Sequence, residues 1–97
     1  MTVRVDDPAW NRIVVDMDGT LCRSYWPHGS VDDIPHLEPV TGSVEAVRRI
    51  KEKGYGVVIW TSRPEQLRAV TEKWLKDHGV PYDELWMDKP SYLVFID

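Results

Sequence analysis

Short apolar runs divide the chain at intervals, and each run is bounded by polar, Gly or Pro residues. The runs at 12–16 and 56–60 are rich in β-branched residues and predict two buried strands. A short segment at 84–86 and the apolar run at 92–96 predict two more. Two of the predicted strands are continuously apolar, as expected when both faces of a strand are covered.

Two segments between these strands carry apolar residues at helical spacing. The first is expected to start at a cap formed by Thr41 or Ser43 and to end at Gly54, with basic residues in its second half. The second follows Ser62 and Glu65, which have the spacing of a capping box. Strands that alternate with helices indicate right-handed crossovers, so the sequence predicts an α/β fold with a parallel sheet.

Length and composition narrow the class of protein. The 97 residues fit one domain, 1–97, and 42% hydrophobic with 29% charged residues is ordinary for a globular protein. A net charge of −4 offers no basic footprint and argues against a nucleic-acid partner. The single cysteine excludes an internal disulfide and suits a reducing compartment. With no run long enough to span a bilayer and no signal peptide, we expect a cytoplasmic protein that does not enter membranes.

The most informative motif is Asp16-Met17-Asp18-Gly19-Thr20, directly after the first strand. Side chains alternate along a strand, so Asp16 and Asp18 are expected on the same side. Two carboxylates beside Gly backbone and a hydroxyl form a hard-oxygen site for a magnesium-type ion. In such a pair one carboxylate can be a nucleophile and the other an acid and base. The alternative is a turn with two solvated Asp residues.

Three more polar residues fall near strand ends. Thr61 ends the second strand, Lys89 precedes the last one and Asp97 follows it. In a parallel sheet these positions meet at one edge, where an ammonium, a hydroxyl and carboxylates suit phosphoryl transfer. Each has an ordinary alternative: Thr61 as a helix-entry residue, Lys89 as a solvated loop lysine, and Asp97 as a frayed end.

With these residues in place, the chain resembles the haloacid dehalogenase (HAD) superfamily of phosphatases. The family's first motif, Asp-x-Asp-Gly-Thr, is matched in full by residues 16–20. Its Thr or Ser after the second strand matches Thr61, and its Lys before the fourth strand matches Lys89. Its final acidic pair is matched only by Asp97. The resemblance implies a Rossmann-like three-layer α/β/α core that lacks its C-terminal end.

The resemblance also implies roles for these residues. Asp16 is expected to attack phosphorus and form an aspartyl-phosphate, while Asp18 protonates the leaving oxygen and then activates water. Thr61 is expected to hydrogen-bond the phosphoryl oxygens, and Lys89 to offset negative charge on Asp16 and on the phosphate. Mg²⁺ is expected to bind a carboxylate oxygen of Asp16, the backbone carbonyl of Asp18, and Asp97.

The sequence says less about which residues bind the substrate than about the catalytic residues. Gly19, Ser62 and Arg63 are candidate substrate-binding residues, the last two near a helix N-terminus. The loop at 22–39 shows no helical or strand period and is too short for a cap domain, so we expect a small, capless protein with an open site. An open site suits a bulky phosphomonoester, such as a sugar phosphate on a carrier. Within that loop an aromatic flap over the substrate is a further candidate: Tyr25, Trp26 and His28.

Other functions fit the sequence only in part. The incomplete final motif favours a non-catalytic phosphate-binding or interaction module with a degenerate site. A receiver-type phosphoacceptor domain requires an Asp at the end of its third strand, where only Asp88 is near. A cysteine phosphatase requires an Arg six residues after Cys22, and that position is His28. The sequence leaves undecided whether the protein forms a homodimer, in which a second copy would cover a bare edge of the sheet.

Overall fold

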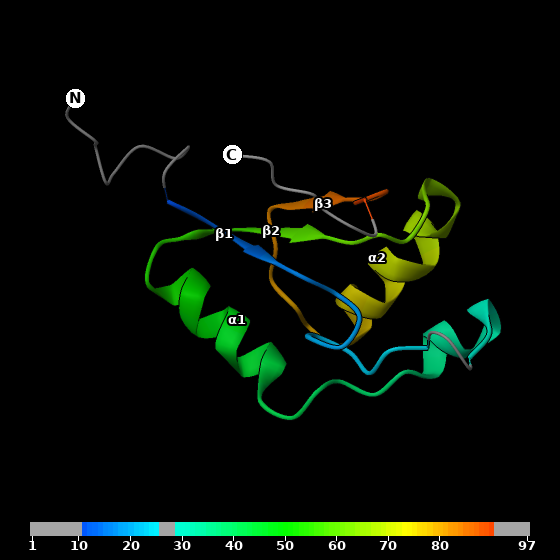
Figure 1. Cartoon of the computed structure of the whole chain (residues 1–97). Helices are drawn as coiled ribbons and strands as arrows, with labels where there is room; N and C mark the ends of the chain where they lie inside the picture. Colours follow the sequence, from blue (N-terminus) through cyan, green and yellow to red (C-terminus); the bar gives the residue numbers. More distant parts are fainter. Residues whose placement is uncertain (1–10, 26–28, 91–97) are drawn as a thin grey trace, which may run out of the picture.

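Three parallel strands form the centre of the molecule in a computed structural model that describes residues 11–25 and 29–90 (Figure 1). They are β1 (Arg12–Val15), β2 (Gly56–Trp60) and β3 (Glu84–Trp86), paired in the order β1-β2-β3. All three strand predictions are confirmed: β1 and β2 are rich in β-branched residues, and β3 is the short segment Glu84–Trp86. The fourth predicted strand, at 92–96, lies outside the described residues.

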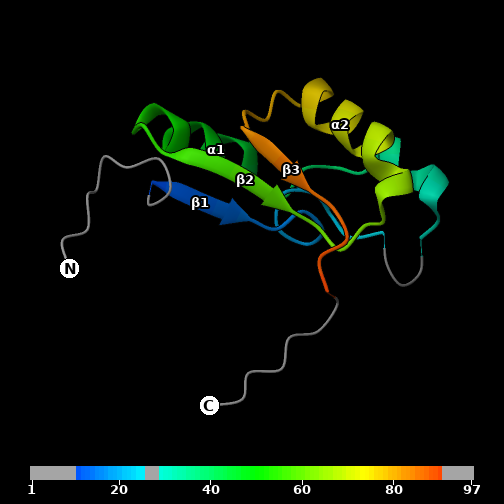
Figure 2. The same ribbon diagram turned by 90° about the horizontal axis from the view of Figure 1, so that it is seen from above.

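Two helices connect the strands and lie on the same face of the sheet (Figures 1 and 2). Helix α1 (Ser43–Glu52) joins β1 to β2, and α2 (Arg68–Asp77) joins β2 to β3. The α/β Rossmann-like class with a parallel sheet is therefore confirmed. Of the three layers expected, the described residues form the sheet and one helical layer.

The core lies between that face and the helices. Val57, Ile59 and Leu85 point from the sheet toward Val47 and Trp74, and all five are buried. The opposite face is partly open, because Val14 is 54% exposed. No helix among the described residues has the length and apolar character that crossing a membrane requires.

Both predicted helix caps are wrong. Helix α1 is preceded by Gly42 at φ 81°, with no side-chain cap, and the Ser43 hydroxyl instead donates to the carbonyl of Leu21. Ser62 makes no capping box with Glu65, because a short 3₁₀ helix, η2 (Glu65–Leu67), with Pro64 before it, precedes α2. Capping depends on backbone angles that side-chain spacing alone does not determine.

A second 3₁₀ helix, η1 (Val31–His36), lies in the segment expected to be an unstructured loop. The Ser30 hydroxyl accepts from the Asp32 amide at 3.1 Å, and the Asp33 carboxylate accepts from the Ser30 amide at 2.8 Å. This reciprocal capping box was present in the sequence as Ser-x-x-Asp. Helix η1 packs against α2 through buried Ile34, so the segment extends the core.

Candidate active site

Asp16 and Asp18 sit on either side of a buried methionine at the carboxyl end of β1. Met17 is fully buried in the core, which directs both carboxylates away from it, as the alternation predicted. The chain then turns sharply: the Leu21 amide donates to the Met17 carbonyl at 2.9 Å, and Gly19 has φ 81°. Glycine adopts that left-handed angle without strain, which lets Asp18 project beside the strand end.

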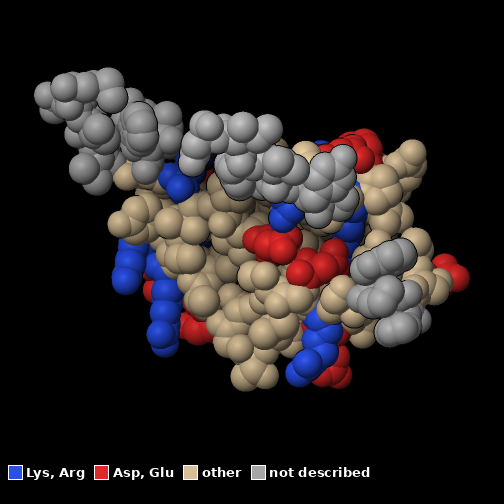
Figure 3. All heavy atoms as spheres, viewed as in Figure 1, with Lys and Arg blue, Asp and Glu red and all other residues tan. Residues whose placement is uncertain are grey.

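Asp16 is held by two donors on one of its oxygens. Its Oδ1 accepts from the Met17 amide at 2.8 Å and from Lys89 Nζ at 3.0 Å. Among the described residues no donor contacts Oδ2, and the Asp16 side chain is 48% exposed. One oxygen of this carboxylate is therefore oriented, while the other accepts no hydrogen bond from the described residues. The face of the molecule shown in Figure 3 carries acidic side chains with basic side chains near them.

Two backbone hydrogen bonds bring Lys89 to this edge of the sheet. The Lys89 amide donates to the carbonyl of Thr61, and the Asp88 amide donates to the carbonyl of Arg63, both at 2.9 Å. Asp88 adopts φ 59°, which turns the chain after β3 back toward the end of β2. The Lys89 ammonium also lies 5.8 Å from the centre of the Trp60 ring, a cation–π contact. The predicted pairing of Lys89 with Asp16 is thus present.

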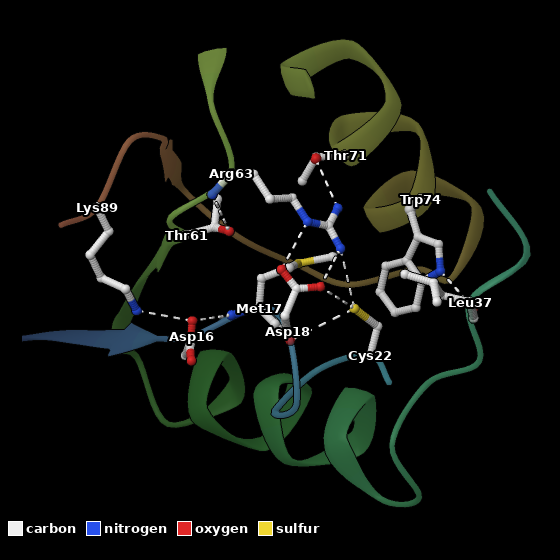
Figure 4. A network of polar contacts seen from close by, with 10 residues as sticks. All are labelled: Asp16, Met17, Asp18, Cys22, Leu37, Thr61, Arg63, Thr71, Trp74 and Lys89. Atoms are coloured by element: carbon white, nitrogen blue, oxygen red, sulfur yellow. Dashed lines mark hydrogen bonds and ion pairs between the residues drawn. The ribbon is translucent and has the colours of Figure 1, made fainter. Parts of the chain in front are cut away.

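Asp18 is engaged by a buried arginine (Figure 4). Arg63 Nε donates to Oδ2 of Asp18 at 3.0 Å, and its Nη2 donates to Oδ1 at 2.7 Å. The Arg63 side chain is 1% exposed and that of Asp18 is 22% exposed. Arg63 Nη1 donates to the Thr71 hydroxyl on α2 at 2.9 Å, and Nη2 also reaches Cys22 Sγ at 3.5 Å. The Asp18 carboxylate is therefore fixed in direction while one side stays open to solvent.

Charge and burial set the protonation of this cluster. Burial is the main factor that raises the pKa of the Cys22 thiol to about 12, and the charge of Asp18 adds to it. A thiol that stays protonated is a poor nucleophile, which agrees with rejecting a cysteine phosphatase. Burial lowers the pKa of Arg63. The hydrogen bonds between Arg63 and Asp18, together with the negative charge of Asp18, outweigh burial and raise the pKa of Arg63 above its usual range.

Thr61 ends β2 and is 1% exposed. Its hydroxyl oxygen accepts from the Arg63 amide at 3.2 Å, which leaves the hydroxyl proton for another acceptor. Figure 4 shows Thr61 at the same edge of the sheet as Asp16, Asp18 and Lys89. Four of the predicted catalytic residues are thus brought together from three separate segments.

The residues expected to bind substrate lie in different settings. Ser62 is exposed at the end of β2, where a ligand can reach it. The Gly19 amide already donates to the carbonyl of Cys22 at 2.8 Å. Arg63 differs from the expectation: its guanidinium is excluded from solvent and faces Asp18, because a buried guanidinium requires a charged partner.

Only part of the expected magnesium site can be described. The open Oδ2 of Asp16 is a hard carboxylate oxygen of the kind Mg²⁺ prefers. The Asp18 carboxylate is occupied by Arg63, which leaves its backbone carbonyl as the expected donor. Asp97 lies outside the described residues. Within 11–25 and 29–90, no group of three or more His, Cys, Asp or Glu side chains is arranged to hold a metal.

Two contacts of this site were missed from the sequence. Thr71 lies on α2 and anchors Arg63, and its position among polar helix residues gave no signal. Tyr25, expected in a flap over the substrate, has its ring 5.5 Å from the Arg63 guanidinium carbon, a cation–π contact. The other two flap residues, Trp26 and His28, lie outside the described residues.

Solved structures with the same arrangement of elements were found. A structural-genomics target from Vibrio cholerae is 26% identical over 90% of this chain and 79% of its own, with a TM-score of 0.67. A chain of the Pnkp1/Rnl/Hen1 RNA repair complex is 25% identical over 95% of this chain, with a TM-score of 0.71, and this chain spans 30% of it.

A third structure, D,D-heptose 1,7-bisphosphate phosphatase from B. bronchiseptica complexed with magnesium and phosphate, is 19% identical over 84% of this chain and 52% of its own. Its TM-score is 0.59. These likenesses show the Rossmann-like α/β fold, with a parallel sheet, that the sequence predicted. No curated protein sequence matches the chain.

The family model described as "PITM 1-3, LNS2 domain" matches residues 13–92. The match begins inside β1, includes both helices and ends beyond β3, so it contains Asp16, Asp18, Thr61 and Lys89. Because the match covers most of the sequence and the whole of the described site, the chain belongs to the LNS2 domain family.

Proposed function

We propose that this protein is a Mg²⁺-dependent phosphomonoester hydrolase that works through an aspartyl-phosphate on Asp16. The observation that carries the proposal is the pairing of two differently held carboxylates. Asp16 has one oxygen bound to Lys89 and the other open. Asp18, two residues after Asp16, is held in place by Arg63. A nucleophile and a separately oriented acid and base are the groups that such hydrolysis requires.

In the first half-reaction the open oxygen of Asp16 attacks phosphorus. The bond from phosphorus to the leaving oxygen breaks, and protonated Asp18 gives its proton to that oxygen. The products are the free alcohol, an acyl phosphate on Asp16, and ionised Asp18. Lys89 Nζ lies 3.0 Å from Oδ1, the other oxygen of the Asp16 carboxylate, and offsets part of the negative charge that gathers at the site.

In the second half-reaction Asp18 acts as a base. It takes a proton from water as the water oxygen attacks phosphorus, and the bond from phosphorus to Asp16 breaks. Inorganic phosphate leaves, Asp16 returns to a carboxylate, and Asp18 is protonated for the next cycle. The hydroxyl proton of Thr61 is available to a phosphoryl oxygen in both halves.

Magnesium is expected to bind a carboxylate oxygen of Asp16, the backbone carbonyl of Asp18, and Asp97. When bound, the ion supplies positive charge for the phosphoryl oxygens. The binding of magnesium and phosphate in the heptose bisphosphate phosphatase structure, which shares the fold, supports this choice of metal.

For the substrate we propose a phosphomonoester with a bulky alcohol part, bound without a cap domain. The exposed Asp16 and Ser62 support an open approach to the site. The name of one similar structure, a heptose bisphosphate phosphatase, is consistent with a sugar phosphate as substrate. The net charge of −4 favours a sugar phosphate or a carrier-linked substrate over nucleic acid.

The experiment is the hydrolysis of phenyl phosphate with Mg²⁺ and with a chelator, using Asp16→Asn as the control. We expect turnover that requires Mg²⁺ and disappears in the variant, whose thermal melting stays close to that of the parent. Equal turnover in both proteins would contradict the nucleophile. No turnover by the parent would favour the second candidate, a non-catalytic phosphate-binding module.

A further inference from the structure

We infer that Arg63 and Thr71 form a buried relay through which helix α2 positions Asp18 for proton transfer. The inference rests on the proposed function, because it assigns positioning residues to that reaction. Neither residue contacts the substrate in this assignment, since Arg63 is 2% and Thr71 is 0% exposed. They act through the Asp18 carboxylate.

The contacts of Arg63 fix the orientation of the Asp18 carboxylate. Arg63 binds both oxygens of Asp18 through Nε and Nη2, so the planar guanidinium fixes the plane of the carboxylate as well as its position. A lysine in the same place could hold only a point contact. The third guanidinium nitrogen, Nη1, is bound by the Thr71 hydroxyl at 2.9 Å, which prevents the plane from rotating.

Burial makes this arrangement stiff. Cys22 Sγ lies 3.5 Å from Arg63 Nη2 and Tyr25 covers the guanidinium at 5.5 Å, so its neighbours leave little room for a second orientation. Thr71 lies in the second turn of α2, which packs on the core through Trp74 and Leu75. The position of Asp18 is thereby tied to a rigid helix, although Asp18 itself lies in a turn.

Asp18 remains able to work while it is held. Oδ1 of Asp18 accepts from Arg63 and also from the Cys22 thiol at 3.6 Å, whereas among the described residues Oδ2 accepts only from Arg63, which leaves Oδ2 a second lone pair. The side chain is 22% exposed, so the leaving oxygen can approach from the open side. A displacement of the carboxylate would weaken proton transfer to that oxygen more than it would weaken attack by Asp16.

This difference gives the test. We compare kcat/KM for two substrates of similar shape: 2,4-dinitrophenyl phosphate, whose leaving group departs without a proton, and phenyl phosphate, whose leaving group needs one. Because kcat/KM reports the steps up to release of the alcohol, hydrolysis of the phosphoenzyme does not enter. General acid catalysis contributes about 10²- to 10⁴-fold, so Arg63→Lys should lower the phenyl phosphate value about 10- to 100-fold. The loss for the dinitrophenyl ester should be at least about tenfold smaller.

Thr71 supplies a matched pair of variants that alter no charge. Thr71→Val keeps the shape and removes the hydroxyl that binds Arg63, while Thr71→Ser keeps the hydroxyl. We expect Thr71→Val to lower the phenyl phosphate value selectively, by about 3- to 10-fold, and Thr71→Ser to retain most of it. These variants keep the test valid if Arg63→Lys does not fold.

The outcomes separate the inference from the function on which it rests. Selective loss on phenyl phosphate, with rescue by Thr71→Ser, supports the relay. An equal loss on both esters, or no loss, in an active protein overturns the relay and leaves the hydrolase intact. If the parent hydrolyses neither ester, the proposed function fails and the relay falls with it.

Discussion

The pair of Asp18 and Arg63 should contribute to folding as well as to chemistry, and a double-mutant cycle can measure how much. Arg63→Met keeps much of the apolar stem and removes the charge, while Asp18→Ala removes the carboxylate. The two variants and their combination isolate the free energy of interaction between the side chains. A positive coupling energy is expected, because each single variant leaves the other charge without its partner.

The size of the effect follows from burial. Breaking a fully buried ion pair costs about 3–5 kcal/mol, whereas an exposed pair is worth about 0.2–1 kcal/mol. Arg63 is 1% exposed and Asp18 22% exposed, with two nitrogen–oxygen distances of 3.0 and 2.7 Å. We therefore expect each single variant to lose about 2–4 kcal/mol and the coupling energy to be about 1.5–3 kcal/mol.

Urea unfolding followed by tryptophan fluorescence is the assay, since Trp74 is buried in the core. The pair of Glu45 and Arg49 on α1 is the matched control: its atoms are 3.6 Å apart, with side chains 56% and 71% exposed. That pair should give a coupling energy below about 0.5 kcal/mol. A similar value for Asp18 and Arg63 would refute the reasoning, because burial would then add nothing to the interaction.

Two further predictions concern single residues. Lys89→Met should lower kcat/KM for phenyl phosphate by about 10- to 100-fold, because an ammonium 3.0 Å from Asp16 is lost where charge develops; initial rates test this, and an unchanged value would remove Lys89 from the site. The raised pKa of Cys22 predicts slow alkylation by iodoacetamide at pH 8 in the folded protein and fast alkylation in urea. From pH 9 to about 12 the unfolded thiol ionises while the folded one stays protonated, so the free energy of unfolding should fall as pH rises, and Cys22→Ala should lack this component.

The strands and the main catalytic residues could be predicted because their signals are local. A run of β-branched residues followed by Asp-x-Asp-Gly-Thr identifies both β1 and the side to which its carboxylates point. The parallel sheet then brings Thr61 and Lys89 to the same edge, since each follows or precedes a strand in a fixed direction. In these cases position along the chain determined position in the fold.

The surroundings of Asp18 could not be predicted in the same way. Arg63 was a candidate substrate contact because it lies near a helix N-terminus, and only the fold shows that this side chain is buried with Asp18 as its partner. Thr71 looks like any polar residue of an amphipathic helix until α2 is packed against the turn after β1. The predicted helix caps were wrong for a related reason. The residues before α1 and η2 are Gly42 and Pro64, so backbone angles and not a capping side chain determine where each helix begins.

The central claim is that Asp16 carries the phosphoryl group, and the most direct measurement is to locate that group during turnover. The protein is mixed with phenyl phosphate and Mg²⁺, quenched in acid, reduced with borohydride to trap an acyl phosphate, and digested for peptide mass spectrometry. The account predicts a modified aspartate at position 16, absent when substrate is omitted and absent in Asp16→Asn. Modification at another residue, or none in a protein that is turning over, would contradict it.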